Sequence, residues 1–531
     1  MAGGRIDLPL NRLPLPGVRW ERAWLWAASV GAAVLLLLPV LYLLVRFAGA
    51  GPVVWGQLIT TSTAATLART LLLAMAVTTT SALIAVPAAW LTTRSDLPAR
   101  RLLAVLLALP MVIPSYVGAY LLVAFLGPRG MLAQVSGLTV PSLYGFWGAL
   151  LVLTLLCYPY LFLAVRSALQ GIDPAVEEAA RSLGCSAWGV FRRVTLPHLR
   201  PALAAGGLLV ALYVLRDFGA VSILRYDTFT RVIYIQYQSA FDRQAASGPA
   251  LLLVALTLIL LALEARARGQ QHYRRMAGGA RVSSSTRLGR WRVPALIFCG
   301  VIITAALVMP VGVLAYWLAR GLQAGEQIAA LWESARNSLL ASGLAALVTL
   351  PLALLPSLLS ARAPGRGSSL LYGLAYAGYA LPGIVVALAV VFFGLRFAEP
   401  LYGSLAMLLL AYVILFAPQA MGVLRGALLQ LPAHVEDAAR SLGRGPLRVL
   451  VEVTLPLIRP GIRAGAALVF LTAMKELPAT LILSPLGFET LAVDLWSAVS
   501  EAFFARAAAP ALLLVLFSSV PAAFFLSLEQ K

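Results

Sequence analysis

The chain has 531 residues, of which 61% are hydrophobic and only 12% are charged, and its mean hydropathy is +0.88. Soluble globular domains average about 25% charged residues, so this composition excludes a soluble enzyme, a disordered regulator and a secreted disulfide scaffold. The formal net charge of +20 would suit nucleic acid if it formed a soluble basic face, but in a membrane protein the basic residues report topology first.

Twelve apolar runs separated by charged residues are predicted to cross the membrane, since a bilayer core requires about 20 mostly apolar residues per helix. The first run continues too long for a cleavable signal peptide. In the first half of the chain the predicted spans are residues 23–45, 70–91, 102–126, 143–165, 202–215 and 248–263. In the second half they are residues 293–318, 338–359, 369–395, 403–424, 464–483 and 507–528.

The distribution of arginine orients these spans. With the amino terminus in the cytoplasm, the cytoplasmic segments carry 29 of the 41 basic residues and 11 of the 21 acidic residues. The opposite orientation would place most of the positive charge on the translocated side, against the positive-inside tendency. Both termini are therefore predicted to be cytoplasmic, and the positive charge requires no nucleic-acid partner.

A basic stretch with glycine and serine clusters lies between the sixth and seventh predicted spans. It reads EARARGQQHYRRMAGGARVSSSTRLGRWR over residues 264–292, a composition typical of a linker. It divides the chain into a first half, residues 1–263, and a second half, residues 293–531. We interpret it as a cytoplasmic tether whose arginines contact anionic headgroups, with a dedicated regulatory site as the alternative.

The two halves repeat one another in the same direction. The 25 residues that begin at Glu177 and the 25 that begin at Glu436 are identical at 14 positions without a gap. The register extends outward at offsets of 259 and 268 residues, which pair Asp217 with Glu476 and Arg94 with Arg362. A parallel repeat of this kind is related by an axis along the membrane normal, so the chain is predicted to be an all-α fused pseudo-dimer of two six-helix halves.

Each repeated stretch is a long polar excursion on the cytoplasmic side. In the first copy, Asp173 can cap a helix over residues 175–183 that Gly184 ends. A second short helix over residues 186–194 is predicted to stop at Pro197. Two short helices that meet at a glycine form a protrusion able to enter a cleft on a partner. The alternative is an amphipathic helix on the inner leaflet, which would not require the same glycine spacing twice.

This repeated spacing resembles the EAA coupling motif of permeases in bacterial ABC-type importers. The residues that carry the resemblance are Glu177, Glu178, Ala179, Ala180, Gly184, Leu196 and Pro197 in loop 173–201, and Glu436, Asp437, Ala438, Ala439, Gly443, Leu455 and Pro456 in loop 432–460. The second copy departs from the pattern because Asp437 replaces glutamate. The resemblance implies an inner-membrane protein of the MetI-like, type I importer fold that docks on separate ATPase subunits, expected as a homodimer, and on a periplasmic substrate-binding protein.

The resemblance also implies that this chain performs no catalysis and binds no cofactor, with ATP and magnesium held by the partner ATPase. Neither of its two lysines, Lys475 and Lys531, lies in a Gly-x-x-x-x-Gly-Lys-[Ser/Thr] pattern, so no P-loop is present. The implied mechanism is alternating access, in which ATP binding closes the two ATPase subunits beneath the coupling helices and opens the permease outward.

The stretches DFGAVSILRYDTFTRVIY and KELPATLILSPLGFETLAV resemble two-domain ferric-iron permeases, which have this length and layout. Permeases for thiamine, polyamines or phosphonates have similar segments and are the alternative. The acids that open these stretches, Asp217 and Glu476, are candidate oxygen ligands on the substrate path. Each follows a base, Arg216 or Lys475, so two local ion pairs at helix ends are the simpler interpretation.

Two other classes of protein share part of this pattern. A major-facilitator-like secondary transporter also has twelve spans in parallel halves, but it would need ionisable residues within the membrane for ion coupling, and the predicted spans place nearly all charges at their ends. A membrane enzyme would need a clustered catalytic set. The three histidines and three cysteines are dispersed, and they predict neither a metal cage nor a disulfide framework.

Overall fold

The structure is a computed structural model that contains helices and loops but no strands in the part of the chain it describes. Within that part, an isolated backbone bridge joins Ser95 to Thr286. The described residues are 17–49, 56, 60–138, 141, 143–239, 247–275, 286–326 and 331–528. Helices satisfy every backbone hydrogen-bonding group within one segment, as a chain that crosses lipid must.

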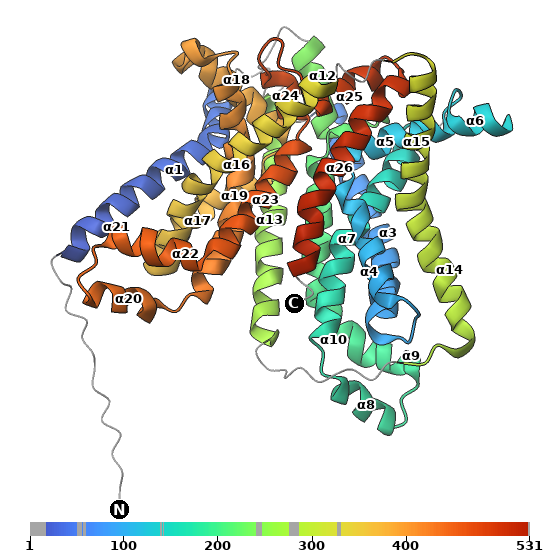
Figure 1. The fold of residues 1–531 in the computed structure, drawn as a ribbon, viewed down its shortest axis with the longest axis horizontal. Helices are drawn as coiled ribbons and strands as arrows, with labels where there is room; N and C mark the ends of the chain where they lie inside the picture. The colour runs from blue at the N-terminus through green and yellow to red at the C-terminus, as the bar shows by residue number, and fades with distance from the viewer. Residues whose placement is uncertain are drawn as a thin grey trace, which may run out of the picture.

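The first half runs from α1 to α13 (Figure 1). Its elements are α1 (Gly17–Ala48), α3 (Thr61–Arg94), α4 (Arg100–Ala108), η1 (Leu109–Val112), α5 (Ser115–Leu126), α6 (Met131–Ser136), α7 (Phe146–Gln170), α8 (Pro174–Ser182), α9 (Ala187–Val190), η2 (Phe191–Thr195), α10 (Leu196–Arg216), α11 (Gly219–Ile223), α12 (Phe229–Ser239) and α13 (Ser247–Arg275). Helix α13 continues past residue 264, so the predicted linker begins as an extension of this helix.

The second half repeats this order with small differences. Its elements are η3 (Gly289–Trp291), α14 (Arg292–Ile303), η4 (Thr304–Val308), α15 (Met309–Gln323), α16 (Leu331–Arg362), α17 (Arg366–Tyr376), η6 (Ala377–Ala380), α18 (Gly383–Phe397), η7 (Glu399–Leu401), α19 (Leu405–Gln430), α20 (Ala433–Ser441), α21 (Pro446–Val449), η8 (Leu450–Thr454), α22 (Leu455–Leu457), α23 (Arg459–Met474), α24 (Pro478–Leu483), α25 (Leu491–Ser500) and α26 (Phe504–Leu528). The repeat predicted from the sequence is therefore present in the order of the elements.

Eight helices in the described residues are long and apolar enough to cross a membrane, and ten if two bent helix pairs each form one crossing. The sequence predicted twelve. The sixth and twelfth predicted spans coincide with shorter apolar helical segments, Gly248–Leu263 and Phe504–Ser519. The fifth crossing is longer than predicted and runs over Trp188–Arg216.

The third and ninth predicted spans are not continuous helices, contrary to the sequence-based expectation. In the first half, α4 ends in the 3-10 turn η1, and Pro114 is the N-cap of α5. In the second half, α17 ends in η6, and Pro382 is the N-cap of α18. A proline lacks the N–H that would continue the helix and disfavours helical backbone in the residue before it. Each break therefore lies at the same place in the repeat.

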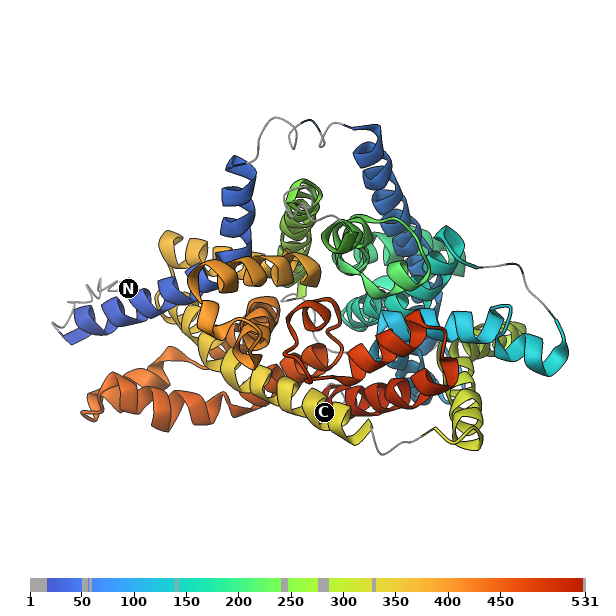
Figure 2. The same cartoon turned by 90° about the horizontal axis from the view of Figure 1, so that it is seen from above.

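The first helix of each half packs against the opposite half. Helix α1 contacts α16, α17 and α18, whereas α14 contacts α4 and α15 contacts α5. Figure 2 shows this exchange: the blue helix α1 lies beside the orange helices of the second half. The two halves share one continuous buried core that includes residues of both.

The short polar helices α8 and α20 lie at one end of the molecule, and α12, α24 and α25 lie at the opposite end (Figure 1). Helices α3 and α7 in the first half, and α16 and α19 in the second, form the main packed pair beside each polar helix. The two copies of the repeated motif are thus presented on the same side of the membrane-crossing body.

Candidate functional site

The two polar helices α8 and α20 are built as the sequence predicted. The Asp173 carboxylate caps α8 by accepting a hydrogen bond from the N–H of Ala175 at 3.0 Å. Both helices end before a glycine with left-handed backbone, Gly184 with φ +84° and Gly443 with φ +79°. L-residues with a side chain adopt this conformation at a cost of about 1 kcal/mol. The glycine spacing therefore fixes where each helix stops.

The segment after the glycine differs from the prediction. Pro197 does not stop a helix but lies at the start of α10, inside one helical run over Trp188–Arg216. A π-helical turn, η2, precedes it. The second half has the matching π-helical turn η8, followed by Pro456 in the first turn of α22 and a bend of 74° before α23.

One carboxylate of each copy points into the protein. Glu177 is 8% exposed, and its Oε1 accepts a hydrogen bond from the Thr195 hydroxyl at 3.1 Å. The Arg94 guanidinium lies 3.9 Å from the same oxygen and donates to the backbone carbonyls of Leu169 and Ile172, each at 2.9 Å. The end of α3 thus clamps the end of α7 and the first polar helix together.

The second copy has the same three side chains in a tighter arrangement. The Thr454 hydroxyl donates to Oε1 of Glu436 at 2.8 Å. Arg362 forms a two-point ion pair with this carboxylate, with Nε 2.9 Å from Oε2 and Nη2 3.0 Å from Oε1. Its Nη1 also donates to the carbonyl of Leu431 at 3.3 Å. The Nη2 contact is a charge-assisted hydrogen bond, which is stronger than one between neutral groups, whereas the Nε contact is close without hydrogen-bond geometry.

Other members of the predicted motif face outward. Glu178 is exposed, and Asp437 is exposed and pairs with Arg440 of its own helix at 3.6 Å. Of the motif alanines, Ala179 and Ala438 are exposed, Ala180 is half-buried and Ala439 is buried. The side chains at the turn into the π-helix, Leu196, Pro197, Leu455 and Pro456, are half-buried. The predicted set therefore divides into an inward clamp and an outward surface.

Large apolar side chains surround this outward surface in both copies. Leu183 and Leu442, next to the two end glycines, are 85% and 83% exposed. Trp188 and its repeat equivalent Leu447 are 69% and 66% exposed. Exposed apolar side chains on a polar protrusion mark an interaction surface, for a protein or for a membrane. The sequence did not single out these four residues, although two of them flank the predicted helix-ending glycines.

The two candidate path carboxylates cap short helices. Asp217 is 7% exposed, and its Oδ2 accepts hydrogen bonds from the N–H groups of Ala220 at 3.1 Å and Val221 at 3.3 Å. Glu476 does the same for α24, with Oε1 accepting from the N–H of Ala479 at 3.1 Å. Each carboxylate therefore satisfies the free amides at the start of a short helix.

The two bases beside these acids reach across to the opposite half. The Arg216 guanidinium lies over the Tyr379 ring at 5.2 Å, and Lys475 Nζ donates to the Met111 carbonyl at 3.3 Å. Tyr379 and Met111 lie in η6 and η1, which are equivalent in the repeat. In the part of the chain the structure describes, the ion pairs predicted between each base and its neighbouring acid are not formed.

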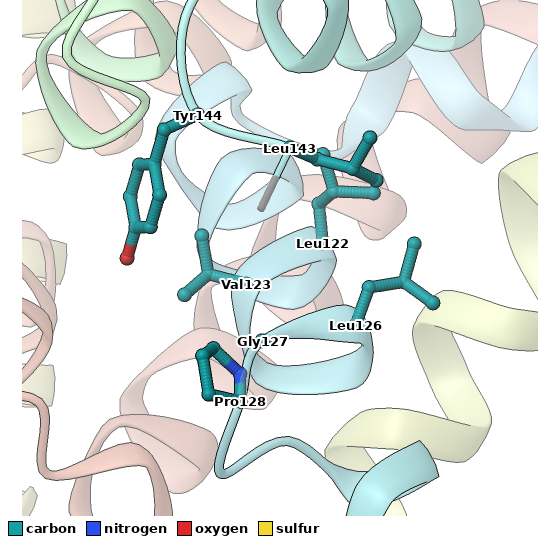
Figure 3. Close-up of a pocket in the computed structure, with 7 residues that line it drawn as sticks. All are labelled: Leu122, Val123, Leu126, Gly127, Pro128, Leu143 and Tyr144. Carbon is teal, nitrogen blue, oxygen red and sulfur yellow. The ribbon is translucent and has the colours of Figure 1, made fainter. Parts of the chain in front are cut away.

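No group of three or more histidine, cysteine, aspartate or glutamate side chains among the described residues could hold a metal ion. A hollow near the carboxyl end of α5 is apolar (Figure 3), and the residues that line it are Leu122, Val123, Leu126, Gly127, Pro128, Leu143 and Tyr144. Another hollow, between α15 and α26, includes Glu489 and Asp494, and their mutual hydrogen bond raises the pKa of Glu489.

The long apolar helices and the repeated order of elements are those of an integral membrane protein built from two halves, with a polar protrusion from each. The sequence matches the binding-protein-dependent transport system inner membrane component pattern twice, over residues 81–268 and 350–531. The chain belongs to this family. The duplicated match agrees with the repeat seen in both the sequence and the structure.

Relatives of known description extend over different parts of the chain. The Fe(3+)-transport system permease protein FbpB 2 of Haemophilus influenzae is 33% identical over 94% of this chain and 97% of its own length. The putative ferric transport system permease protein FbpB 1 of the same organism is 26% identical over 71% of this chain and 63% of its own length. The molybdenum transport system permease protein ModB of Escherichia coli is 33% identical over 33% of this chain and 79% of its own length.

Proposed function

We propose that this chain is the permease subunit of an ATP-driven ABC importer for ferric iron. The observation that carries the proposal is the similarity to a ferric-iron permease along nearly the whole of both chains. The molybdenum permease is similar over only a third of this chain, so it supports the class of transporter more than the cargo. A multi-pass protein of the inner membrane follows from the family and from the apolar helices.

The partners we propose are a pair of identical ATPase subunits on the side of α8 and α20, and a periplasmic substrate-binding protein on the opposite side. The outward carboxylates Glu178 and Asp437, together with the exposed leucines that follow them, form the docking surface for the ATPases. Nucleotide and magnesium then belong to those subunits, and this chain contributes no hydrolytic site. The concentration of arginine beside the polar helices supports a cytoplasmic position for that side and for both termini.

In this mechanism the coupling helices convert closure of the ATPases into movement of the two halves. The clamps through Glu177 and Glu436 join each coupling helix to the ends of two long helices, so force applied at the protrusion reaches the membrane-crossing body. The substrate path we propose follows the seam between the halves, where Asp217 and Glu476 position the short helices α11 and α24. Their carboxylates act there as helix caps whose negative charge borders the path.

The test is uptake of radioactive ferric iron into proteoliposomes that contain the full permease, its ATPases and its binding protein. We expect Glu178→Lys to abolish uptake while ATP hydrolysis continues, because charge reversal breaks the contact that transmits force. Glu178→Asp, which keeps the negative charge at the same exposed position, is the matched control and retains uptake. Undiminished uptake by Glu178→Lys contradicts the coupling role, and uptake of molybdate or sulfate in place of iron contradicts the cargo.

A further inference from the structure

The last residues of the linker between the halves, Thr286–Leu288, are bound to the first half. The Thr286 N–H donates to the Arg94 carbonyl at 2.8 Å, and the Asp96 N–H donates to the Thr286 carbonyl at 3.2 Å. The Leu288 N–H donates to the Asp96 carboxylate at 2.9 Å. Three backbone donors are thus satisfied between this segment and the turn that follows α3, which makes the segment part of the folded body.

The same segment also contacts the first coupling helix. The Arg181 guanidinium, in the last turn of α8, donates to the Thr286 hydroxyl at 3.2 Å. The carbonyl that receives the Thr286 N–H belongs to Arg94, whose guanidinium faces Glu177. Thr286 therefore bonds to both parts that the first clamp joins, the end of α3 and the coupling helix.

Among the described residues, the second half shows no equivalent of this contact. In the repeat register, Ser95 and Asp96 correspond to Ala363 and Pro364. A proline has no N–H to donate, and neither residue offers a carboxylate. Arg440, the equivalent of Arg181, pairs instead with Asp437 of its own helix at 3.6 Å. In the part of the chain that the structure describes, the second coupling helix therefore lacks this support and is held by its clamp and by packing on α21 and η8.

The two clamps differ in length, and the linker contacts the half that has the longer one. The Arg94 guanidinium approaches Glu177 at a single 3.9 Å contact, whereas Arg362 pairs with Glu436 at 2.9 Å and 3.0 Å. Electrostatic attraction and hydrogen bonding both weaken over that additional ångström. The half with the looser pair is the half that the linker braces.

We propose that Thr286–Leu288 is a strap that positions the first coupling helix, with Thr286, Asp96 and Arg181 as its positioning residues. It holds α8 against the end of α3 as the two-point ion pair holds α20 against the end of α16. This inference rests on the proposed function, because a coupling role gives the orientation of α8 its importance. It assigns to the linker a part in ATP coupling in addition to joining the halves.

The test compares the mobility of the two coupling helices in the same full-length protein. Spin labels are placed on the full chain in lipid nanodiscs through Ser182→Cys or Ser441→Cys, which are equivalent exposed positions, after Cys157, Cys185 and Cys299 are replaced by alanine. Thr286→Val removes the hydroxyl that Arg181 contacts, and Thr286→Ser retains it. Loss of one hydrogen bond of about 1 kcal/mol raises the undocked population roughly fivefold.

We expect Thr286→Val to increase the mobility of the label at position 182 and to leave the label at position 441 unchanged, whereas Thr286→Ser matches the wild type at both. Asp96→Ala, which removes the acceptor of the Leu288 N–H, acts in the same direction. In proteoliposomes, Thr286→Val lowers the iron transported per ATP hydrolysed, and Thr286→Ser restores it.

An unchanged label at position 182 in both Thr286→Val and Asp96→Ala overturns the strap, as does an equal gain of mobility at both positions, which would be general loosening. The label measurement needs no transport. Failure of the wild-type protein to take up iron would therefore contradict the proposed function while leaving the strap to be judged by the spectra.

Discussion

The two coupling segments have the same sequence pattern and the same helices, yet they are held in different ways. The second is fixed by a two-point ion pair between Arg362 and Glu436. The first has one longer contact between Arg94 and Glu177, and the linker adds hydrogen bonds through Thr286. A duplicated motif can thus keep its geometry while the interactions that maintain it diverge.

This difference has a physical basis in the turn after each clamp arginine. In the first half the turn offers the N–H and the carboxylate of Asp96 to a neighbouring backbone, and the linker occupies both. In the second half Pro364 offers neither. A buried ion pair is stabilising only with good geometry and satisfied hydrogen bonds, and the second clamp, with contacts of 2.9 Å and 3.0 Å, comes closer to that condition than the first, with 3.9 Å.

The largest expected effect comes from neutralising the clamp acids. Glu436→Gln removes the negative charge that pairs with the Arg362 guanidinium. Breaking a buried ion pair in this way lowers the free energy of unfolding by about 3–5 kcal/mol. Glu177→Gln costs about 1 kcal/mol, because the ion pair that it breaks is 3.9 Å long and Arg94 keeps its two carbonyl acceptors. For both variants, thermal unfolding in detergent measures the loss of stability and iron uptake measures the loss of activity. Equal losses from the two variants would show that the clamps are equivalent.

Removing the threonine hydroxyls should reverse this order. Thr195→Val takes from Glu177 its shortest contact and leaves it the 3.9 Å approach of Arg94, whereas Thr454→Val leaves Glu436 its two-point ion pair. We expect a loss of about 1 kcal/mol for Thr195→Val and a smaller loss for Thr454→Val, measured by the same unfolding assay. A larger loss from Thr454→Val would contradict the reading of the first clamp as the weaker one.

The smallest effect is expected at the outward carboxylates. Asp437→Glu restores the residue found in the first copy and adds one methylene to an exposed side chain. It should change iron uptake by less than about twofold, since exposed ion pairs contribute roughly 0–1 kcal/mol. Glu178→Asp is the matched exchange. A loss of uptake as large as that of Glu178→Lys would mean that side-chain length, in addition to charge, determines the grip on the ATPase.

Local signals in the sequence predicted the coupling helices well. The Asp173 cap and the helix-ending glycines act within a few residues of themselves, so neighbouring residues suffice to place them. Pro197 was misinterpreted as a stop, because the same residue type can end one helix or begin another. The internal repeat predicted the parallel halves, since identity at a fixed offset does not depend on tertiary contacts.

Features that depend on distant contacts were not predictable. The repeat aligned Arg94 with Arg362, but their partners lie 83 and 74 residues away along the chain. The linker was interpreted as a tether from its composition, and composition does not reveal that Thr286 bonds to the turn after α3. The repeat predicted that Asp217 and Glu476 are equivalent. It did not predict that they cap α11 and α24, because the sequence did not indicate these short helices.

The exchanged first helices have a consequence for the covalent connection between the halves. Helix α1 lies against α16, α17 and α18, and α14 and α15 lie against α4 and α5. Each half therefore holds helices of the other half by packing contacts. A permease nicked between α13 and Thr286 would still travel as a single particle. The association of the two halves therefore does not depend on an unbroken linker, and the linker is free to take part in positioning the first coupling helix.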